Sequence, residues 1–122
     1  ADDINKLQQI TVEVNTEGEE LSLPEDVKLG FFRIAQEALN NARKHARASR
    51  VIVGLKYSRN RILMTISDNG TGFDVQKAKV QTNLKGSLGL MSMQERAKLI
   101  GASLKIESKV GQGTVITVEL SL

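Results

Sequence analysis

The chain has 122 residues, a length typical of one domain, and its formal net charge is a modest +3. It contains no cysteine, which excludes disulfides, thiolate metal sites and thiol nucleophiles. With three Phe, one Tyr and no Trp, its core must be built from aliphatic side chains.

The first third of the chain predicts a strand followed by a long helix. Residues 1–8 are interpreted as the end of a linker helix. From Gln9 to Val14, apolar and polar residues alternate, which predicts a half-buried strand. Pro24 suits the first position of a helix that continues to about Ala46. Apolar residues recur along that helix with helical period: Val27, Phe31, Ile34, Ala35, Ala38 and Ala42.

The rest of the chain predicts four strands and a second helix. The strands are expected at residues 51–57, 62–68, 104–108 and 114–121. The first two form a hairpin, and a polar, glycine-punctuated stretch follows them to about Leu88. The second helix is expected from about Gly89 to Ile100, where Gly101 ends it.

This order of elements predicts an α/β (α+β) two-layer sandwich, in which helices cover one face of a sheet. The sheet is expected to be mixed, mostly antiparallel and built from about five strands. The sequence shows no internal repeat and no low-complexity tract. We therefore expect residues 1–122 to form a single domain.

Glycine is concentrated in the second half of the chain. Seven of the ten glycines lie between Asp68 and Thr114, mostly at the ends of predicted elements. Glycine at such positions lets the backbone approach a ligand and present N–H groups to an anion. Glycine-rich turns without any ligand are more common, so the cluster alone does not establish a phosphate site.

Two polar side chains are predicted to project into the apolar layer of the sheet. Asp68 shares its strand face with Ile62, Met64 and Ile66, because side chains alternate along a strand. Thr114 likewise shares a face with the apolar residues of the last strand. A buried carboxylate needs partners, so the pair favours a ligand that supplies donors, such as the adenine amino group. The alternative is a structural Asp that caps the turn after residue 68.

A polar stripe borders the apolar face of the long helix. Glu37, Asn41 and Lys44 fall on it at helical spacing. A carboxylate, an amide oxygen and an ammonium group suit Mg²⁺ bound together with phosphates, although an ordinary solvated face has the same pattern. His45, the single histidine, is expected at the end of this helix. There it would lie at the surface, or contact residues of the site without touching the ligand.

In chain order, these segments resemble the catalytic domain of sensor histidine kinases in the GHKL superfamily, which has the Bergerat ATP-binding fold. The resembling segments are the N box at 36–46 and three glycine boxes at 68–73, 86–97 and 111–114. Two features resemble those of one subfamily. The first is the Met-x-x-Arg-Ala pattern at Met93, Arg96 and Ala97, and the second is the short stretch between the first two glycine boxes. That subfamily is paired with response regulators that carry a helix-turn-helix output domain.

The resemblance implies a role for each element of the site. Asn41 would bind Mg²⁺, Lys44 would contact phosphate, and Asp68 would read the adenine amino group with help from Thr114. Glu37 and Lys44 are the candidate catalytic residues. In the ATPases of the superfamily, an acidic residue at the position of Glu37 activates water, whereas in the kinases it orients Mg²⁺ or the acceptor.

The glycine boxes would complete the nucleotide site. Gly70 and Gly72 would leave room for the base and the ribose, and residues 75–87 would form the ATP lid. The resemblance also places phosphate contacts at the start of the second helix: Gly86, Ser87, Leu88, Gly89 and Leu90.

The implied partners are ATP or ADP, a dimerisation and phosphoacceptor domain, and a response regulator with helix-turn-helix output. The chain opens on Ala1, and we expect a domain cut from a longer protein whose acceptor histidine lies elsewhere. We expect the isolated domain to be monomeric and cytoplasmic. We expect its parent protein to be a homodimer, and an anchor of that parent in the cell membrane is compatible with this interpretation. Nucleic acid is not expected, because the basic residues 43–50 include no aromatic side chain for base stacking.

Three other functions remain open from the sequence. An anti-sigma-factor serine kinase would use the same pocket on a partner's serine. An ATPase or ATP-gated switch of the gyrase type would use it for hydrolysis, and a non-catalytic nucleotide-binding module would only bind.

Overall fold

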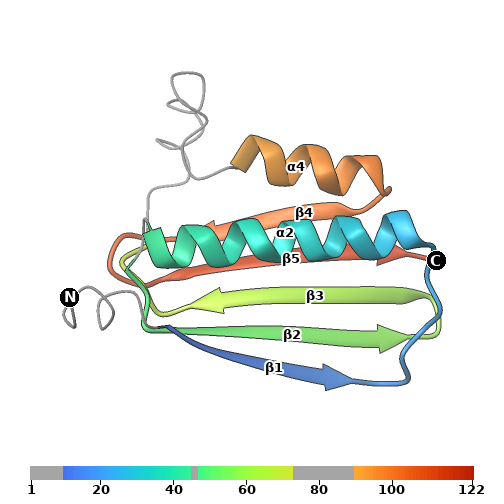
Figure 1. The fold of residues 1–122 in the computed structure, drawn as a ribbon, viewed down its shortest axis with the longest axis horizontal. Coiled ribbons are helices and arrows are strands. Elements are labelled where there is room, and N and C mark those ends of the chain that lie inside the picture. The colour runs from blue at the N-terminus through green and yellow to red at the C-terminus, as the bar shows by residue number, and fades with distance from the viewer. Residues whose placement is uncertain (1–9, 45–46, 73–89) are drawn as a thin grey trace.

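The computed structural model describes residues 10–44, 47–72 and 90–122. These residues form five strands and two helices in the predicted chain order (Figure 1). The elements are β1 (Thr11–Glu17), α2 (Glu25–Lys44), β2 (Arg50–Ser58), β3 (Arg61–Asp68), α4 (Leu90–Leu99), β4 (Ser103–Ser108) and β5 (Thr114–Ser121). The predicted linker helix at 1–8 and the predicted lid at 75–87 lie outside the described residues.

The five strands form one sheet in the order β1-β2-β3-β5-β4. β1 runs parallel to β2, and the other three pairs are antiparallel. The parallel pair follows from the connection, because α2 carries the chain back across the sheet before β2 begins. The predicted mixed, mostly antiparallel sheet of about five strands is confirmed.

Both helices lie on one face of the sheet and bury an aliphatic core against it (Figure 1). Alternate residues of β3 and β5 supply the centre of that core in matched register: Met64 lies opposite Val118 and Ile66 opposite Ile116. The helices also approach each other closely. A Cβ atom on Gly30 of α2 would come within 2.7 Å of a methyl group of Ile100, just beyond α4. The predicted two-layer sandwich is therefore confirmed.

The predicted burial of the first strand is wrong. Its helix-facing side chains are largely in solvent: Val12 is 43% exposed and Val14 is 61% exposed. β1 is the edge strand, and α2 packs over β2 and β3 and leaves β1 outside the helix layer (Figure 1). Alternation of apolar and polar residues identifies a strand, but it cannot show whether anything covers the apolar side.

The described part of the long helix runs to Lys44, and that of the second helix starts at Leu90. The predicted limits of these two helices, at about Ala46 and Gly89, lie outside the described residues. Within the described residues, no helix is long and apolar enough to cross a membrane.

The two methionines of α4 give a test of how this helix is attached to the core. Met93 is completely buried, whereas Met91 is 54% exposed on the same helix. We expect Met93→Ala to lower the free energy of unfolding by about 2–5 kcal/mol, because it leaves a cavity. Met91→Ala should change it by less than about 0.5 kcal/mol. Urea unfolding of both variants measures the difference, and equal losses would contradict the packing of α4.

Candidate functional site

Four element ends meet at one end of the molecule. The C-terminal ends of α2 and β3 lie there together with the start of β5 and the start of α4 (Figure 1). β5 starts beside the end of β3 because the two strands are antiparallel and Asp68 is in register with Thr114. The predicted site residues on α2, β3 and β5 are therefore carried to the same end of the fold.

A row of three polar side chains crosses this end of the sheet. Asp68 of β3 lies opposite Thr114 of β5, and Thr114 lies opposite Ser108 of β4. Thr114 is the one buried polar side chain among the described residues, and its Oγ1 lies 2.8 Å from Oγ of Ser108. Ser108 Oγ also donates to the carbonyl oxygen of Gly113 at 3.0 Å. The row places hydrogen-bonding groups at the end of an otherwise apolar face.

Asp68 is half-buried at the end of this row. Its Oδ1 accepts a hydrogen bond of 2.8 Å from the backbone N–H of Gly70. Burial raises the pKa of this carboxyl above its usual range, and the backbone N–H groups of Gly70 and Thr114 partly oppose that shift. The capping of the turn expected from the sequence is thus present. A carboxylate that has lost part of its hydration also favours a ligand that brings its own donors.

The glycines around the row allow backbone to pack against backbone. Gly72 has a φ of 68°, and a Cβ atom there would overlap the carbonyl oxygen of Lys109. Gly113 has a φ of 82°, and its Cβ would overlap the carbonyl oxygen of Asp68. The backbone N–H of Gly111 donates to the Thr71 carbonyl oxygen, which joins the two loops. Both positions therefore require glycine because of their positive φ and the close approach of another backbone segment. That these glycines also leave space for a base and a ribose stays a prediction.

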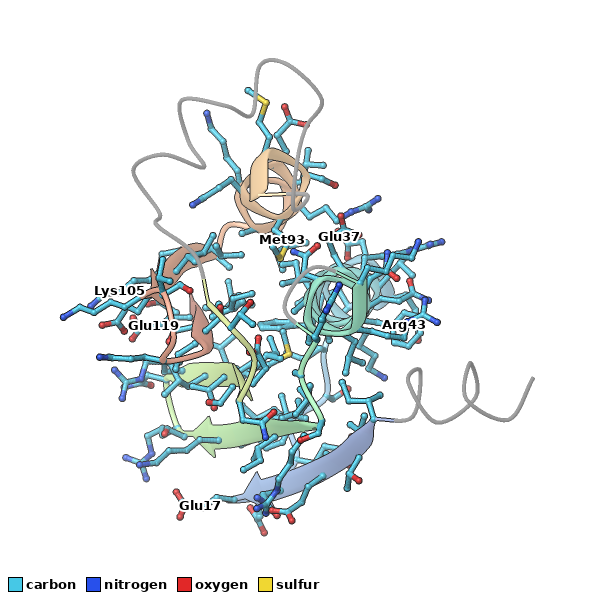
Figure 2. All side chains as sticks on the ribbon, turned by 90° about the vertical axis from the view of Figure 1, so that its left-hand side faces the viewer. Glu17, Glu37, Arg43, Met93, Lys105 and Glu119 are labelled. Carbon is cyan, nitrogen blue, oxygen red and sulfur yellow. The ribbon has the colours of Figure 1, made fainter. Side chains whose placement is uncertain are left out.

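The polar stripe of α2 borders the core as predicted. Glu37 and Asn41 are partly buried, and Lys44 is exposed in the last turn of the helix. Glu37 lies on the side of α2 that faces α4, whereas Arg43 points away from α4 (Figure 2). Glu37 also borders a hollow of about 590 Å³, which Arg33 and Arg96 help to line.

A divalent metal ion would find few protein ligands here. The described residues contain no group of three His, Cys, Asp or Glu side chains that could hold one. Asn41 and Glu37 offer one amide and one carboxylate, both oxygen donors. This donor set fits Mg²⁺, which often binds through one or two protein groups plus substrate phosphates.

Part of the predicted site lies outside the described residues. It consists of Gly86, Ser87, Leu88 and Gly89, together with His45. Leu90 is the first residue of α4, and only its backbone is described.

Two further residues of this region, Ser108 and Asn69, were given no role in the predictions from the sequence. Ser108 follows Leu104 and Ile106 on the same strand face, so the alternation that identified Asp68 would also have identified it. The side chain of Asn69 joins the end of β3 to Ser49 and to Arg50, the first residue of β2. No pattern in the sequence indicates that long-range contact.

Comparison with known proteins identifies the family of the chain. Residues 26–122 match the family model described as "Histidine kinase-, DNA gyrase B-, and HSP90-like ATPase". The chain is 37% identical over 106 residues to the signal transduction histidine-protein kinase/phosphatase DegS of Bacillus subtilis, covering 87% of this chain and 27% of that protein. It is 37% identical over 98 residues to the oxygen sensor histidine kinase NreB of Staphylococcus carnosus, covering 80% of this chain and 27% of that protein. The chain thus spans about a quarter of the length of these relatives.

Solved structures share the fold. The ATP binding domain of PrrB from Mycobacterium tuberculosis matches with a TM-score of 0.65 and 23% identity, over 99% of this chain and 87% of that one. The histidine kinase AdeS of Acinetobacter baumannii matches with a TM-score of 0.73 and 12% identity, over 98% of this chain and 58% of that one. At these identities the likeness establishes the architecture alone.

Two glycines next to the polar row form a matched pair for testing the close backbone packing. Gly111 and Gly113 have nearly equal φ angles of 83° and 82°, but a Cβ on Gly111 would meet nothing within 4 Å. We expect Gly111→Ala to cost about 1–2 kcal/mol of stability from the positive φ alone. Gly113→Ala should cost about 2–5 kcal/mol, because the overlap with Asp68 adds to the same strain. Thermal or urea unfolding compares them, and equal costs would argue against the close approach.

The raised pKa of Asp68 predicts a specific pH dependence of stability. The pKa of Asp68 in the folded state lies above its unfolded value of about 3.9. The folded state therefore binds the proton more tightly than the unfolded state. Because of this, the contribution of Asp68 to the free energy of unfolding falls as pH rises. Asp68→Asn removes the titration. The stability of the parent chain relative to Asp68→Asn should therefore decrease from about pH 4 upward until the folded carboxyl is ionised. Unfolding free energies of both proteins between about pH 4 and 7 measure it, and an increase would mean a lowered pKa.

Proposed function

Because the chain belongs to the histidine kinase-, DNA gyrase B- and HSP90-like ATPase family, we propose that it is the ATP-binding catalytic domain of a two-component sensor histidine kinase. In this proposal it transfers the γ-phosphoryl group of ATP to a histidine on a separate dimerisation and phosphoacceptor domain of the same parent protein. The relatives that carry histidine kinase names support this function over a serine kinase or a hydrolase.

The observation that carries the proposal is the position of Asp68. Its carboxylate is half-buried, is in register with the buried Thr114, and has a pKa raised by burial. The exocyclic amino group of adenine would donate a hydrogen bond to this carboxylate and so replace part of the hydrogen bonding to water that burial removes. Guanine presents a carbonyl oxygen at the corresponding position, which the carboxylate would repel. Thr114 would assist through its hydroxyl group, which Ser108 holds in place.

The α2 helix would provide the phosphate end of the site. Asn41 would hold Mg²⁺ through its amide oxygen, and Lys44, in the last turn, would contact the phosphates. Mg²⁺ bound there would neutralise charge on the β- and γ-phosphates during transfer. Phosphates would be unfavourable beside the negative end of the helix dipole without a cation. The ammonium group of Lys44 supplies one.

The reaction requires an external nucleophile. A neutral imidazole nitrogen of the acceptor histidine would attack the γ-phosphorus, the bond to the β,γ-bridging oxygen would break, and ADP would leave with that electron pair. Glu37 is partly buried on the side of α2 that faces α4. We assign it the orientation of the acceptor or of the metal, since a kinase must not activate water.

The remaining partners follow from the same proposal. A response regulator with a helix-turn-helix output domain would receive the phosphoryl group from the acceptor histidine. The parent protein would be a homodimer through its phosphoacceptor domain, and this chain would be monomeric on its own.

A phosphotransfer assay tests the proposed function. The chain is mixed with Mg²⁺, ATP labelled on the γ-phosphate, and the phosphoacceptor part of its parent protein. We expect acid-labile label on that partner, and no label when a chelator removes Mg²⁺. Asp68→Ala should weaken ATP binding about ten- to a hundred-fold, the value of a hydrogen bond to a charged group.

The matched control is Ser67→Ala, which changes the neighbouring residue on the opposite face of β3 and should leave ATP binding unchanged. Acid-stable label on the partner would indicate a serine kinase. Release of free phosphate without label on the partner would indicate a hydrolase. Equal affinities of the parent chain for ATP and GTP would contradict the assignment of Asp68.

A further inference from the structure

The side chain of Asn69 makes three hydrogen bonds to two consecutive residues that are distant in the sequence. Its Oδ1 accepts from the backbone N–H groups of Ser49 and Arg50, both at 3.0 Å. Its Nδ2 donates to Oγ of Ser49 at 2.9 Å. Its own backbone N–H donates to the carbonyl oxygen of Arg50 at 3.2 Å. The carboxamide therefore continues the pairing of β2 and β3 beyond their last paired residues.

The segment that Asn69 holds is the one that leaves α2. The N–H of Ala48 donates to the carbonyl oxygen of Ala42 in the last turns of the helix at 2.9 Å, and Ala48 itself is buried. Arg47, just before it, has a φ of 51°, which is uncommon for a residue other than glycine. Two contacts therefore fix the chain between the helix and β2. Ala48 is held by its hydrogen bond to the helix, and Ser49 and Arg50 are held by the side chain of Asn69.

Asn69 is also the residue directly after Asp68, so its contacts join the two ends of the proposed nucleotide site. On one side is the carboxylate that would bind adenine. On the other side is the end of α2, with Asn41 and Lys44 at the phosphates. Among the described residues, the Asn69 side chain is the one that hydrogen-bonds between the end of β3 and the segment after α2.

We propose that Asn69 is a positioning residue, which holds the end of α2 at a fixed distance from the end of β3 and so matches the site to the length of ATP. The inference rests on the proposed function and adds a residue to it. Asn69 itself touches neither the base nor the phosphates in this proposal. It acts by holding the groups that do.

The chemistry of the contact explains why asparagine suits it. One oxygen must accept from two adjacent amides while the other end of the same planar group donates to a hydroxyl, as a peptide group would. Alanine removes all three bonds. Aspartate keeps the two bonds to the amides and can accept from Ser49, because a hydroxyl group can reverse its direction.

A comparison of ATP with adenosine separates positioning from a purely structural function. Adenosine reaches the adenine end alone, whereas ATP needs both ends at the right distance. In Asn69→Ala we expect ATP affinity to fall about tenfold, a modest loss because water can replace part of these surface bonds. Adenosine affinity should fall less than about threefold. Calorimetric titration of folded protein, checked by circular dichroism, gives both values.

Two further variants complete the test. Asn69→Asp should recover most of the ATP affinity at 1 M salt, where its added charge is screened beyond about 3 Å. Asn15→Ala is the matched control, since it removes the same group from an exposed strand residue whose side chain donates to Glu13. It should change neither affinity. If Asn69→Ala does not fold, Asn69→Ser, which keeps one acceptor oxygen, takes its place in the same comparison.

The outcomes distinguish the inference from the proposed function. Equal losses for ATP and adenosine would overturn positioning, because Asn69 would then act through the adenine pocket alone. Unchanged ATP affinity in the folded variant would overturn it as well and leave Asn69 with a structural function. Failure of Asn69→Asp to recover ATP affinity would contradict the assigned hydrogen bonds. A parent chain that does not bind ATP would overturn the proposed function and the inference together.

Discussion

The pairing of β3 with β5 is the constraint on which the core and the site both depend. Its register brings Met64 opposite Val118 and Ile66 opposite Ile116 in the middle of the sheet, and Asp68 opposite Thr114 at the end. A slip of one residue would turn each of these side chains to the other face. The burial of the aliphatic residues therefore fixes the position of Asp68 and Thr114, since these two residues lie on the same face of β3 and β5 as the aliphatic ones.

The polar row is held at a place where polar groups are costly. Thr114 is buried and shares its hydroxyl contact with Ser108, and burial raises the pKa of Asp68. The carboxylate accepts hydrogen bonds from the backbone N–H groups of Gly70 and Thr114, which only partly offset its loss of hydration. Sites that bind ligands often depart from the rule that cores are apolar, because the ligand supplies the missing partner. The packed glycines Gly72 and Gly113 each allow one backbone segment to lie directly on another next to this row.

Local patterns predicted the residues of the candidate site that alternate along one strand or repeat along one helix. Asp68 and Thr114 followed from strand alternation, and Glu37, Asn41 and Lys44 followed from helical spacing. The same reasoning overestimated the burial of β1, because alternation does not report what covers Val12 and Val14. It also missed Asn69, whose partners lie 19 and 20 residues earlier in the chain.

The sequence by itself determined the order of the elements, the composition of the core and the face on which each candidate residue lies. These properties depend on neighbours within about four positions, where helical and strand periods act. Only the tertiary structure decided that β1 would be an edge strand with largely exposed apolar side chains and that Ser108 would support Thr114. It also decided that the side chain of Asn69, at the end of β3, would hydrogen-bond to Ser49 and Arg50. Each of these outcomes depends on which strands become neighbours and where the helix layer stops, and those choices are made by long-range packing.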